Sequence, residues 1–355
     1  MVAENVDVLL VSDLVNVRYL SGFTGSNAAL LVYTDGTPSV LATDTRYVTQ
    51  AGRQAADLDL VVDGACGRAL IKRALIKRAS GGSGLRIGFE SHVVTVDGHG
   101  LLAAQVAEYC GSELLRCPAL VEKLRQIKDA GELELLARAC AVADAALTAL
   151  LEGGGLCAGR TEREVAAELE MLMARHGADG PSFETIVAAG VNSAVPHHRP
   201  TTAVLEPGDF VKIDFGALVG GYHSDTTRTF VLGCAQPWQR EIFELVAAAQ
   251  QKGCDALKPG TDLADVDAAA RTIIAAVGYG DRFGHGLGHG VGLQIHEAPG
   301  IGPTAAGTLR AGSVVTVEPG VYLPDRGGVR IEDTLVVGER AAESLTRFPR
   351  DLITI

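Results

Sequence analysis

Two segments of this sequence repeat one pattern, and the repeat constrains the fold more than any other feature. The segment from Leu205 to Gly233 aligns with the segment from Leu309 to Gly338 at apolar, glycine and acidic positions. Each copy has an alternating apolar run, a glycine-bearing turn and a second β-rich run, a pattern typical of two antiparallel strands. Two such units related by a pseudo-twofold axis predict a curved antiparallel sheet.

Each copy carries two acidic residues at matched positions. Asp214 aligns with Glu318, and Asp225 aligns with Glu332. A single acid in a strand usually lies on a solvated face. Four acids at matched positions in two repeats indicate a shared site, because the pseudo-twofold axis would bring the four carboxylates together.

A glycine-rich segment between the copies contains three of the nine histidines, His285, His289 and His296. Its alternating glycines exclude a regular helix and permit close approach of the backbone. One histidine in a core is usually hydrogen-bonded to a carbonyl group. Three histidines within one short glycine-rich segment indicate a site.

The repeat extends to helices that precede the strands. The segment from Gly159 to Val165 resembles the segment from Gly260 to Val266. Thr161 and Thr261 are expected N-caps, with acids in the first turn of each helix. Each half is therefore predicted to consist of helices followed by strands, with the helices covering one face of the curved sheet. The helices of the first half are expected at 128–151 and 162–175.

A chain of 355 residues is longer than one hydrophobic core ordinarily supports, so two domains are expected. Residues 1–118 alternate β-like and helical runs and predict an α/β domain. Residues 119–130 are interpreted as the junction, and 131–355 as the second domain. Within the first domain, strands are expected at 7–12, 28–33, 39–42, 58–62 and 85–89, helices at 45–55, 67–79 and 97–109, an exposed loop or cleft wall at 16–27, and a flexible turn at 81–84.

Charge and cysteine usage limit the partners and the compartment. The net charge is −12 without a block of like charges, which argues against a nucleic-acid or anionic-membrane partner. The seven cysteines are scattered and never spaced as CxxC, as expected of free thiols in a reducing compartment. The N-terminal segment has acids where a secretion signal needs basic residues, and no run approaches the ~18–20 apolar residues of a membrane span. These features favour the cytoplasm.

The four acids and one histidine form five candidate metal ligands. A carboxylate-rich set suits harder ions such as Mn²⁺, whereas zinc sites usually contain sulfur or several imidazoles. Four carboxylates balance two divalent cations, which bridging carboxylates would hold roughly 3.5–4 Å apart around a shared, acidified water. This chemistry predicts hydrolysis, and amide cleavage is favoured over phosphoester cleavage because few cations surround the acids. The serine-hydrolase motif GxSxG and the zinc-peptidase motif HExxH do not occur.

Several ordered segments resemble the pita-bread metallopeptidases, the group that includes aminopeptidase P, prolidase, methionine aminopeptidase and creatinase. They are NSAVPHHRPT, KIDFGALVGGYHSDTTRTF, FGHGLGHGVGLQIHE, TVEPGVY and GGVRIED, with YLSGFTGSN and RIGFES in the first domain. The resemblance implies an α/β N-terminal domain followed by an α+β pita-bread catalytic domain with an internal pseudo-twofold repeat. The separate N-terminal domain makes the chain more similar to aminopeptidase P and prolidase than to methionine aminopeptidase.

The resemblance also implies a role for each candidate ligand. Asp214 is expected to bind one metal ion through both oxygens, and Asp225 and Glu332 are expected to bridge two ions. His289 and Glu318 are expected to hold the second ion, with Glu318 also taking the proton from the nucleophilic water. Mn²⁺ is the favoured metal, with Co²⁺ or Zn²⁺ as alternatives.

Other residues are assigned to the substrate and to support of the ligands. His197 and His296 are expected to hydrogen-bond the scissile carbonyl group and its oxyanion. His285 is expected to line a proline pocket, and Arg330 to orient Glu332. The remaining expectations are that Thr227 supports the ligands and that His198 and His223 have structural roles only.

The implied substrate is a peptide with proline in second position, and the implied assembly is a homodimer. A strict dipeptidase must neutralise the proline carboxylate, yet no Lys or Arg lies between His296 and Arg310. An Xaa-Pro aminopeptidase is therefore favoured over a strict Xaa-Pro dipeptidase, and Gly300→Arg is expected to favour dipeptides if that position faces the pocket. The rival hypotheses are a methionine aminopeptidase-like activity and a non-catalytic pita-bread binding protein, which the complete ligand set disfavours.

Overall fold

The computed structural model describes residues 5–79 and 84–355, so most of the expected turn at 81–84 lies outside the described residues. The chain divides into two compact units, Met1–Arg125 and Gln126–Ile355, at a point inside the predicted junction. All seven cysteines are free thiols. Among the described residues, none of the helices combines the length and apolar character that a bilayer crossing requires.

The first unit contains one six-stranded mixed sheet with the order β4-β3-β2-β1-β5-β6. Strand β1 lies antiparallel to β2 and parallel to β5, so the centre of the sheet joins the two modes of pairing. The strands are β1 (Val8–Val11), β2 (Ala28–Tyr33), β3 (Val40–Thr43), β4 (Asp59–Val62), β5 (Arg86–Phe89) and β6 (Glu113–Arg116).

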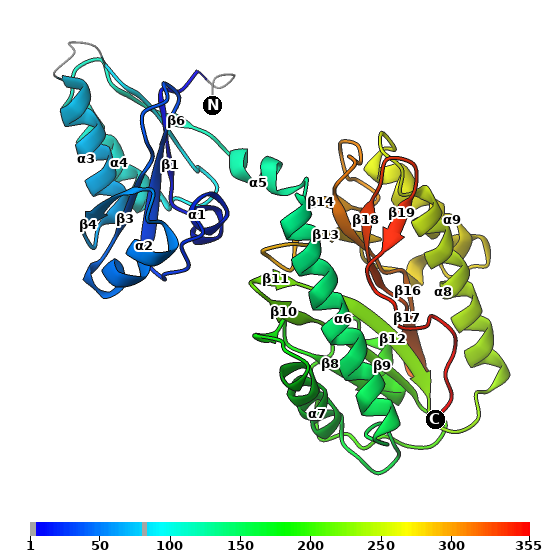
Figure 1. Ribbon diagram of the computed structural model, residues 1–355. Helices are drawn as coiled ribbons and strands as arrows, with labels where there is room; N and C mark the ends of the chain where they lie inside the picture. Colours follow the sequence, from blue (N-terminus) through cyan, green and yellow to red (C-terminus); the bar gives the residue numbers. More distant parts are fainter. Residues whose placement is uncertain (1–4, 80–83) are drawn as a thin grey trace. The chain divides into compact units, whose positions relative to one another are not determined.

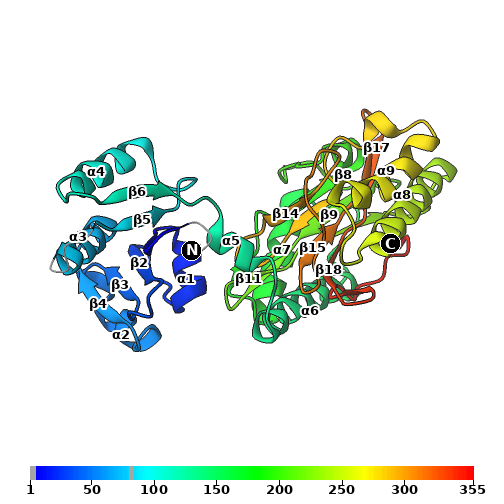
Figure 2. The same cartoon turned by 90° about the horizontal axis from the view of Figure 1, so that it is seen from above.

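Helices cover both faces of this sheet, as Figure 2 shows. Because strand side chains alternate between faces, Leu10 and Leu31 pack with α3 and α4, whereas Leu9 and Leu30 pack on the opposite face. The helices are α1 (Leu14–Ser21), the 3₁₀ turn η1 (Thr45–Tyr47), α2 (Val48–Gln54), α3 (Cys66–Ala79), α4 (Val96–Ala107) and α5 (Leu120–Arg125). The unit is thus the predicted α/β domain with three layers.

The predicted loop at 16–27 is wrong over its first half, where the chain forms α1. Asp13 caps this helix, because its Oδ1 accepts hydrogen bonds from Val15 N at 2.7 Å and Asn16 N at 3.1 Å. Gly22 ends the helix in the left-handed region at φ 73°. Phe23 then enters the core and is 1% exposed, so it does not line a cleft. A helix of eight residues gives too few turns for a clear apolar period.

The second unit begins with two helices and a three-stranded antiparallel sheet of order β12-β9-β8. Its core joins Leu147 of α6 and Leu169 of α7 to strand residues such as Val187 and Val211. The elements are α6 (Ala130–Glu152), α7 (Glu162–Arg175), β7 (Gly180–Pro181), β8 (Ile186–Ala189), η2 (Gly190–Ala194), β9 (Phe210–Phe215), β10 (Ala217–Val219), β11 (Tyr222–His223) and β12 (Thr226–Val231).

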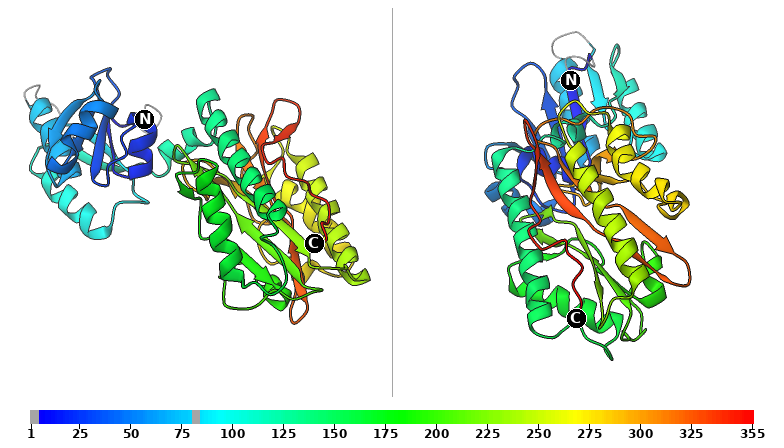
Figure 3. Two further views of the ribbon diagram at one scale, coloured as in Figure 1. Left: turned by 60° about the horizontal axis from the view of Figure 1, so that its bottom comes forward. Right: turned by 90° about the vertical axis from the view of Figure 1, so that its right-hand side faces the viewer.

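The second half of this unit repeats the arrangement, with a five-stranded sheet of order β14-β13-β15-β18-β19. Val246 of α8 and Ile274 of α9 pack against Val315 and Val317. The elements are α8 (Pro237–Ala256), α9 (Leu263–Ala276), η3 (Gly280–Arg282), β13 (Gly288–Gly290), β14 (Glu297–Ile301), β15 (Val314–Val317), β16 (Gly320–Leu323), β17 (Gly327–Arg330), β18 (Asp333–Val337) and β19 (Ala342–Ser344). Figures 1 and 3 show α6 and α8 lying along the strands of this unit.

Equivalent backbone hydrogen bonds confirm the internal repeat. Gly159 N donates to Leu205 O at 2.9 Å, and the matched Gly260 N donates to Leu309 O at 2.9 Å. Thr161 caps α7 in a reciprocal capping box, as predicted. The matched prediction for Thr261 is wrong: Asp262 occupies the N-cap of α9 without a side-chain hydrogen bond. The backbone pattern at this N-terminus is still repeated, because Leu263 N donates to Gly307 O and the matched Glu162 N donates to Ala203 O, both at 3.0 Å.

The two halves are joined directly at the matched acids. Glu332 N donates to Thr227 O at 3.1 Å, which links the start of β18 to β12. Thr227 Oγ1 donates to the Glu332 carboxylate at 2.7 Å, and the matched Thr334 Oγ1 donates to Asp225 O at 2.8 Å. Each threonine therefore bonds to the acidic residue of the other half, Thr227 at the carboxylate of Glu332 and Thr334 at the backbone carbonyl of Asp225. This reciprocal exchange places the ends of the two strand pairs, and the acids on them, beside one another.

Candidate metal centre

One cavity of about 250 Å³ in the second unit collects all five predicted ligands. Asp214 lies within β9, whereas the other acids lie just outside strands: Asp225 before β12, Glu318 after β15 and Glu332 before β18. The predicted substrate histidines His197 and His296 lie on the same wall. The cavity is lined by Phe183, Glu184, Ile186, His197, His198, Arg199, Asp214, Asp225, His289, Ile295, His296, Glu318 and Glu332.

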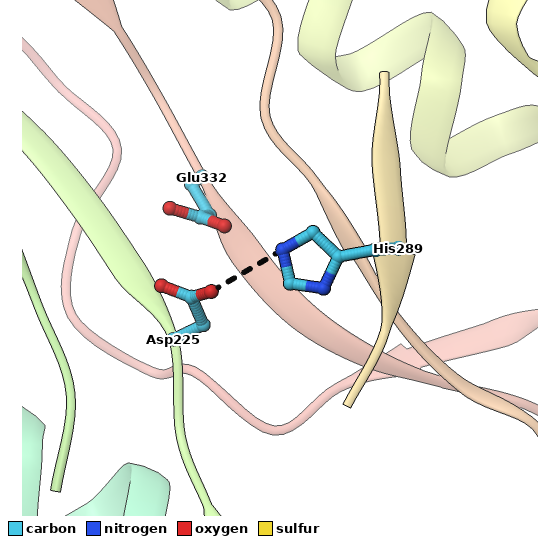
Figure 4. A group of neighbouring side chains, drawn as sticks. All are labelled: Asp225, His289 and Glu332. Carbon is cyan, nitrogen blue, oxygen red and sulfur yellow. Dashed lines mark ion pairs between the residues drawn. The ribbon is translucent and has the colours of Figure 1, made fainter. Parts of the chain in front are cut away.

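Three of these residues already offer a compact donor set. One ligand atom from each of Asp225, His289 and Glu332 lies within 4.8 Å of the other two (Figure 4). His289 Nε2 is 3.5 Å from Asp225 Oδ2 and 3.4 Å from Glu318 Oε1. The other ring nitrogen, Nδ1, donates to Gly290 O at 3.0 Å, which directs Nε2 toward the acids.

The glycines on either side of His289 are required by the close packing of β13. A Cβ atom at Gly288 would lie 2.1 Å from Thr316 O, and one at Gly290 would lie 2.3 Å from Ala298 O. Side chains at these positions would therefore push β13 away from its neighbours. The glycine-rich sequence allows the backbone that carries His289 to approach the acid-bearing strand pair.

Arg330 has a different partner from the one predicted. Its Nη2 pairs with Asp214 Oδ2 rather than with Glu332. Its Nε donates to Thr227 Oγ1 at 3.1 Å, and Thr227 in turn donates to Glu332 at 2.7 Å. The predicted orientation of Glu332 by Arg330 is therefore indirect, through the hydroxyl of Thr227. The supporting role predicted for Thr227 agrees with these two hydrogen bonds.

His285 lies behind the site and outside the residues that line the cavity. Its Nδ1 donates to Gly286 O at 2.8 Å, and its Nε2 accepts from the Tyr322 hydroxyl at 2.9 Å. Tyr322 accepts in turn from Arg330 Nη1 at 2.7 Å. Both ring nitrogens are thus hydrogen-bonded within the protein, and the place of His285 in a proline pocket stays a prediction. Sequence reasoning missed Tyr322, although it follows Glu318 by four residues in the segment TVEPGVY.

The electrostatics of the site fit a bound cation. Burial and the neighbouring carboxylates raise the pKa of Asp225 and of Glu332 well above their ordinary values. Burial lowers the pKa of His289, but the hydrogen bond with Glu318 and the charges of Asp225 and Glu318 raise it to about 9. The crowded negative charge is thus only partly balanced by protein groups.

Two buried carboxylate oxygens of this site also lack a hydrogen-bond partner among the described residues. They are Asp214 Oδ1 and Glu332 Oε1, which belong to opposite halves of the repeat. An unpaired polar atom in this environment is costly unless a ligand satisfies it. Oxygen-rich sites with one imidazole suit divalent ions such as Mn²⁺. The residues present therefore fit the implied metal ions.

The remaining histidines separate into two groups. His197 and His296 are exposed on the cavity wall, and the His296 ring centroid lies 4.4 Å from that of His289. His198 Nε2 donates to Glu162 at 2.8 Å, and His223 Nδ1 lies 2.9 Å from Ser182 Oγ. Protein partners for His198 and His223 agree with the structural roles predicted for them, although His198 also borders the cavity.

Sequence reasoning assigned no role to five residues of the cavity wall. Phe183, Ile186 and Ile295 supply an apolar surface, and Arg199 lies 3.3 Å from Glu184. No motif distinguishes these side chains, because their exposure to the cavity depends on how the loops fold back. Gly300 lies outside this wall and borders a separate depression with Gly286 and Gly288. Gly300→Arg is expected to favour dipeptides only if position 300 faces the pocket, and Gly300 does not line this cavity.

The model of metallopeptidase family M24 matches residues 134–339, and that of the creatinase/prolidase N-terminal domain matches residues 1–127. An Xaa-Pro dipeptidase of Pyrococcus furiosus is 46% identical over 68% of this chain and 69% of its own length. A solved Xaa-Pro dipeptidase from Bacillus anthracis is similar with a TM-score of 0.90, 37% identity and coverage of 99% and 96% of the two chains. A solved X-Pro aminopeptidase from Thermotoga maritima is similar with a TM-score of 0.88 and 32% identity, and the match covers 99% of each chain. The chain therefore belongs to metallopeptidase family M24 and carries a creatinase/prolidase N-terminal domain.

Proposed function

We propose that this metallopeptidase cleaves the bond between an N-terminal residue and a following proline in short peptides. The observation that carries the proposal is the convergence of four carboxylates and His289 on one cavity. Similar proteins of the same family are named Xaa-Pro dipeptidase and X-Pro aminopeptidase, which supports proline as the second residue. The complete donor set disfavours a non-catalytic binding protein.

Asp214, Asp225, His289, Glu318 and Glu332 would hold two divalent ions, with Mn²⁺ as the first choice and Co²⁺ or Zn²⁺ as alternatives. Four carboxylates match the charge of two such ions. When bound, the ions would supply Lewis acidity and lower the pKa of water toward neutrality. The buried oxygens of Asp214 and Glu332 that have no hydrogen-bond partner in the described part of the chain support this assignment.

The protein groups would position the substrate and move the protons. Glu318, whose Oε1 faces His289, would accept the proton of the attacking water and return it to the proline nitrogen. His197 and His296 would donate hydrogen bonds to the scissile carbonyl oxygen as it gains negative charge. A peptide bond before proline has no N–H group, so recognition falls to the ring. The apolar side chains of Phe183, Ile186 and Ile295 offer it a surface.

Dipeptides are now better supported as substrates than the sequence alone indicates. The sequence argument for longer peptides rests on the missing cation after His296. The cavity wall nevertheless carries Arg199, an exposed cation that comes from a different loop. Two of the similar proteins are also named dipeptidases. We therefore place the Xaa-Pro dipeptide first and keep the Xaa-Pro-Xaa peptide as the alternative.

A steady-state assay tests the proposal and separates the alternatives. The metal-reconstituted enzyme is given an Xaa-Pro dipeptide, the matching Xaa-Pro-Xaa tripeptide and the corresponding alanine peptides. We expect cleavage of the proline peptides only, with a higher kcat/KM for the dipeptide. A higher kcat/KM for the tripeptide would favour the alternative hypothesis, an Xaa-Pro aminopeptidase. Equal cleavage of the alanine peptides, or no cleavage at all, would refute the proposed function.

Two further proposals concern the protein in the cell. We propose a homodimer, which the resemblance to the pita-bread peptidases supports. We also propose that the protein works in the cytoplasm, and the seven free thiols support a reducing compartment.

A further inference from the structure

Glu162 lies outside the described donor set, yet its carboxylate organises the segment that carries His197. It is the first residue of α7 and is 0% exposed. An acid at this position usually faces solvent and stabilises the helix through its dipole. Here the carboxylate instead faces residues 189–201, which we call the His197 loop. None of its five hydrogen bonds goes to its own helix.

Each oxygen of Glu162 binds one end of the His197 loop. Oε1 accepts from Ala189 N and Asn192 Nδ2, both at 2.9 Å. Oε2 accepts from His198 Nε2 at 2.8 Å, Thr201 N at 2.9 Å and Thr201 Oγ1 at 2.7 Å. One buried carboxylate therefore fixes the beginning and the end of the loop at once.

The middle of the loop is held from the opposite side. Lys212 Nζ donates to Val195 O at 2.6 Å and to Pro196 O at 3.2 Å. Arg330 Nη1 also donates to Pro196 O at 3.2 Å. His197 lies directly between these carbonyl groups and His198. Its neighbours on both sides are therefore fixed, while its own side chain remains exposed on the cavity wall.

The chemistry of Glu162 suits a fixed anchor. Burial of a carboxylate is costly unless its oxygens are hydrogen-bonded. Burial raises the pKa of Glu162, but the hydrogen bonds from Ala189, His198, Asn192 and Thr201 outweigh this effect and keep the pKa below its ordinary value. The group is therefore an anion near neutral pH, and hydrogen bonds to an anion are stronger than those between neutral groups.

We propose that Glu162 is a positioning residue that holds the imidazole of His197 at the metal cavity by clamping both ends of the His197 loop. The inference rests on the proposed role of His197 in hydrogen-bonding the scissile carbonyl group. Glu162 itself touches neither the cavity nor the predicted ligands. Its effect on catalysis is therefore carried by the His197 loop, and a double-mutant cycle with His197 tests whether this histidine transmits it.

The first test is a double-mutant cycle on kcat with Glu162→Gln and His197→Ala. Glutamine keeps the size but places an NH₂ group among five donors. We expect Glu162→Gln to lower kcat on the order of 10- to 100-fold, as misplacement of a catalytic group does, with metal content unchanged. In the His197→Ala background, Glu162→Gln should add no further loss. Glu170→Gln is the matched control, because Glu170 lies in the same helix and its carboxylate makes no hydrogen bond or ion pair among the described residues.

The second test does not depend on activity. Hydrogen–deuterium exchange of peptides covering 189–201 should accelerate in Glu162→Gln and stay at the wild-type rate in Glu170→Gln. If Glu162→Gln does not fold, Thr201→Val removes the 2.7 Å hydrogen bond to Glu162, together with the 3.0 Å bond from Ala203 N to the same hydroxyl, and should give a smaller change of the same kind.

Three results would overturn the inference: multiplicative losses in the double mutant, loss of metal in Glu162→Gln, or unchanged exchange of the loop. Wild-type hydrolysis of the Xaa-Pro substrate is measured first. If the wild-type enzyme is inactive, or if His197→Ala leaves kcat unchanged, the proposed function or the role of His197 has failed. Faster exchange in Glu162→Gln would then still show the clamp.

Discussion

At the scale of single residues, the metal centre concentrates negative charge, and one hydroxyl and one guanidinium group hold two of its carboxylates in place. Thr227 binds one oxygen of Glu332, and the other oxygen is buried without a partner among the described residues. Arg330 pairs with one oxygen of Asp214, and the second oxygen of Asp214 is likewise buried without a partner among the described residues. The protein thus satisfies half of each carboxylate and presents the other half to a cation.

Removal of metal should therefore abolish activity without unfolding the chain. We expect dialysis against EDTA to eliminate hydrolysis of an Xaa-Pro substrate, and Mn²⁺ or Co²⁺ to restore it. Asp225→Ala should be folded and inactive, because it removes one member of the three-residue donor set. Circular dichroism provides the folding control. Full activity in protein shown to be metal-free by elemental analysis would contradict the metal centre.

Two histidines of the glycine-rich segment, His289 and His296, should differ in what they control. His289→Ala should lose metal, because its Nε2 faces Asp225 and Glu318. His296→Ala should keep its metal and lower kcat by about 10²–10³, the usual cost of removing one oxyanion donor. Metal analysis and kcat of both variants check this assignment. The reverse pattern would mean that the ligand in this segment is His296.

At the scale of elements, a buried ion pair ties the segment before α6 to the start of β14. Lys128 Nζ lies 3.2 Å from Glu297 Oε2, and the two side chains are 1% and 5% exposed. Glu297 Oε1 also accepts from Gln294 N at 2.9 Å. Because Glu297 follows His296 directly, this pair fixes one end of the segment that carries a predicted substrate histidine.

Breaking the Lys128–Glu297 pair should destabilise the protein strongly. We expect Lys128→Met to lower the free energy of unfolding by about 3–5 kcal/mol, because it removes the cation from a buried carboxylate. Lys128→Met with Glu297→Gln should recover part of this loss. The exposed pair Arg347–Glu343 is the control, and Arg347→Met should cost less than about 1 kcal/mol. Equal losses at the two sites in urea titrations would refute this prediction.

Most strands and long helices can be predicted from local sequence, because the spacing of their apolar residues and their capping residues indicate them. The helix 162–175 and the strand 28–33 have the predicted bounds. Helix α8 and strand β6 were not predicted from the sequence, and a loop was predicted over most of α1. Helix α8 could have been predicted, because its buried residues Ile242, Phe243, Val246 and Ala249 recur at helical spacing. Strand β6 could not, because it is a four-residue edge strand with little alternation.

At the scale of the whole molecule, the two units have separate cores, and every described residue of the metal centre lies in the second. The proposed homodimer predicts a sedimenting species of twice the 36.9 kDa chain mass. Sedimentation equilibrium of the full chain over a range of concentrations checks this. A single species at the chain mass across that range would exclude the dimer, and it would leave the assignment of the metal ligands untouched.

The sequence by itself determined the internal repeat, the two-domain architecture and the set of residues that converge on the cavity. These features are encoded in periodicity and in matched positions such as Asp214 with Glu318 and Asp225 with Glu332, which a symmetric pair of strands must bring together. Only the tertiary structure decided which groups hold those residues in place. Arg330 pairs with Asp214, His285 turns to Tyr322, and Glu162 binds the His197 loop. Such contacts depend on where distant loops cross, and this information is absent from any local pattern.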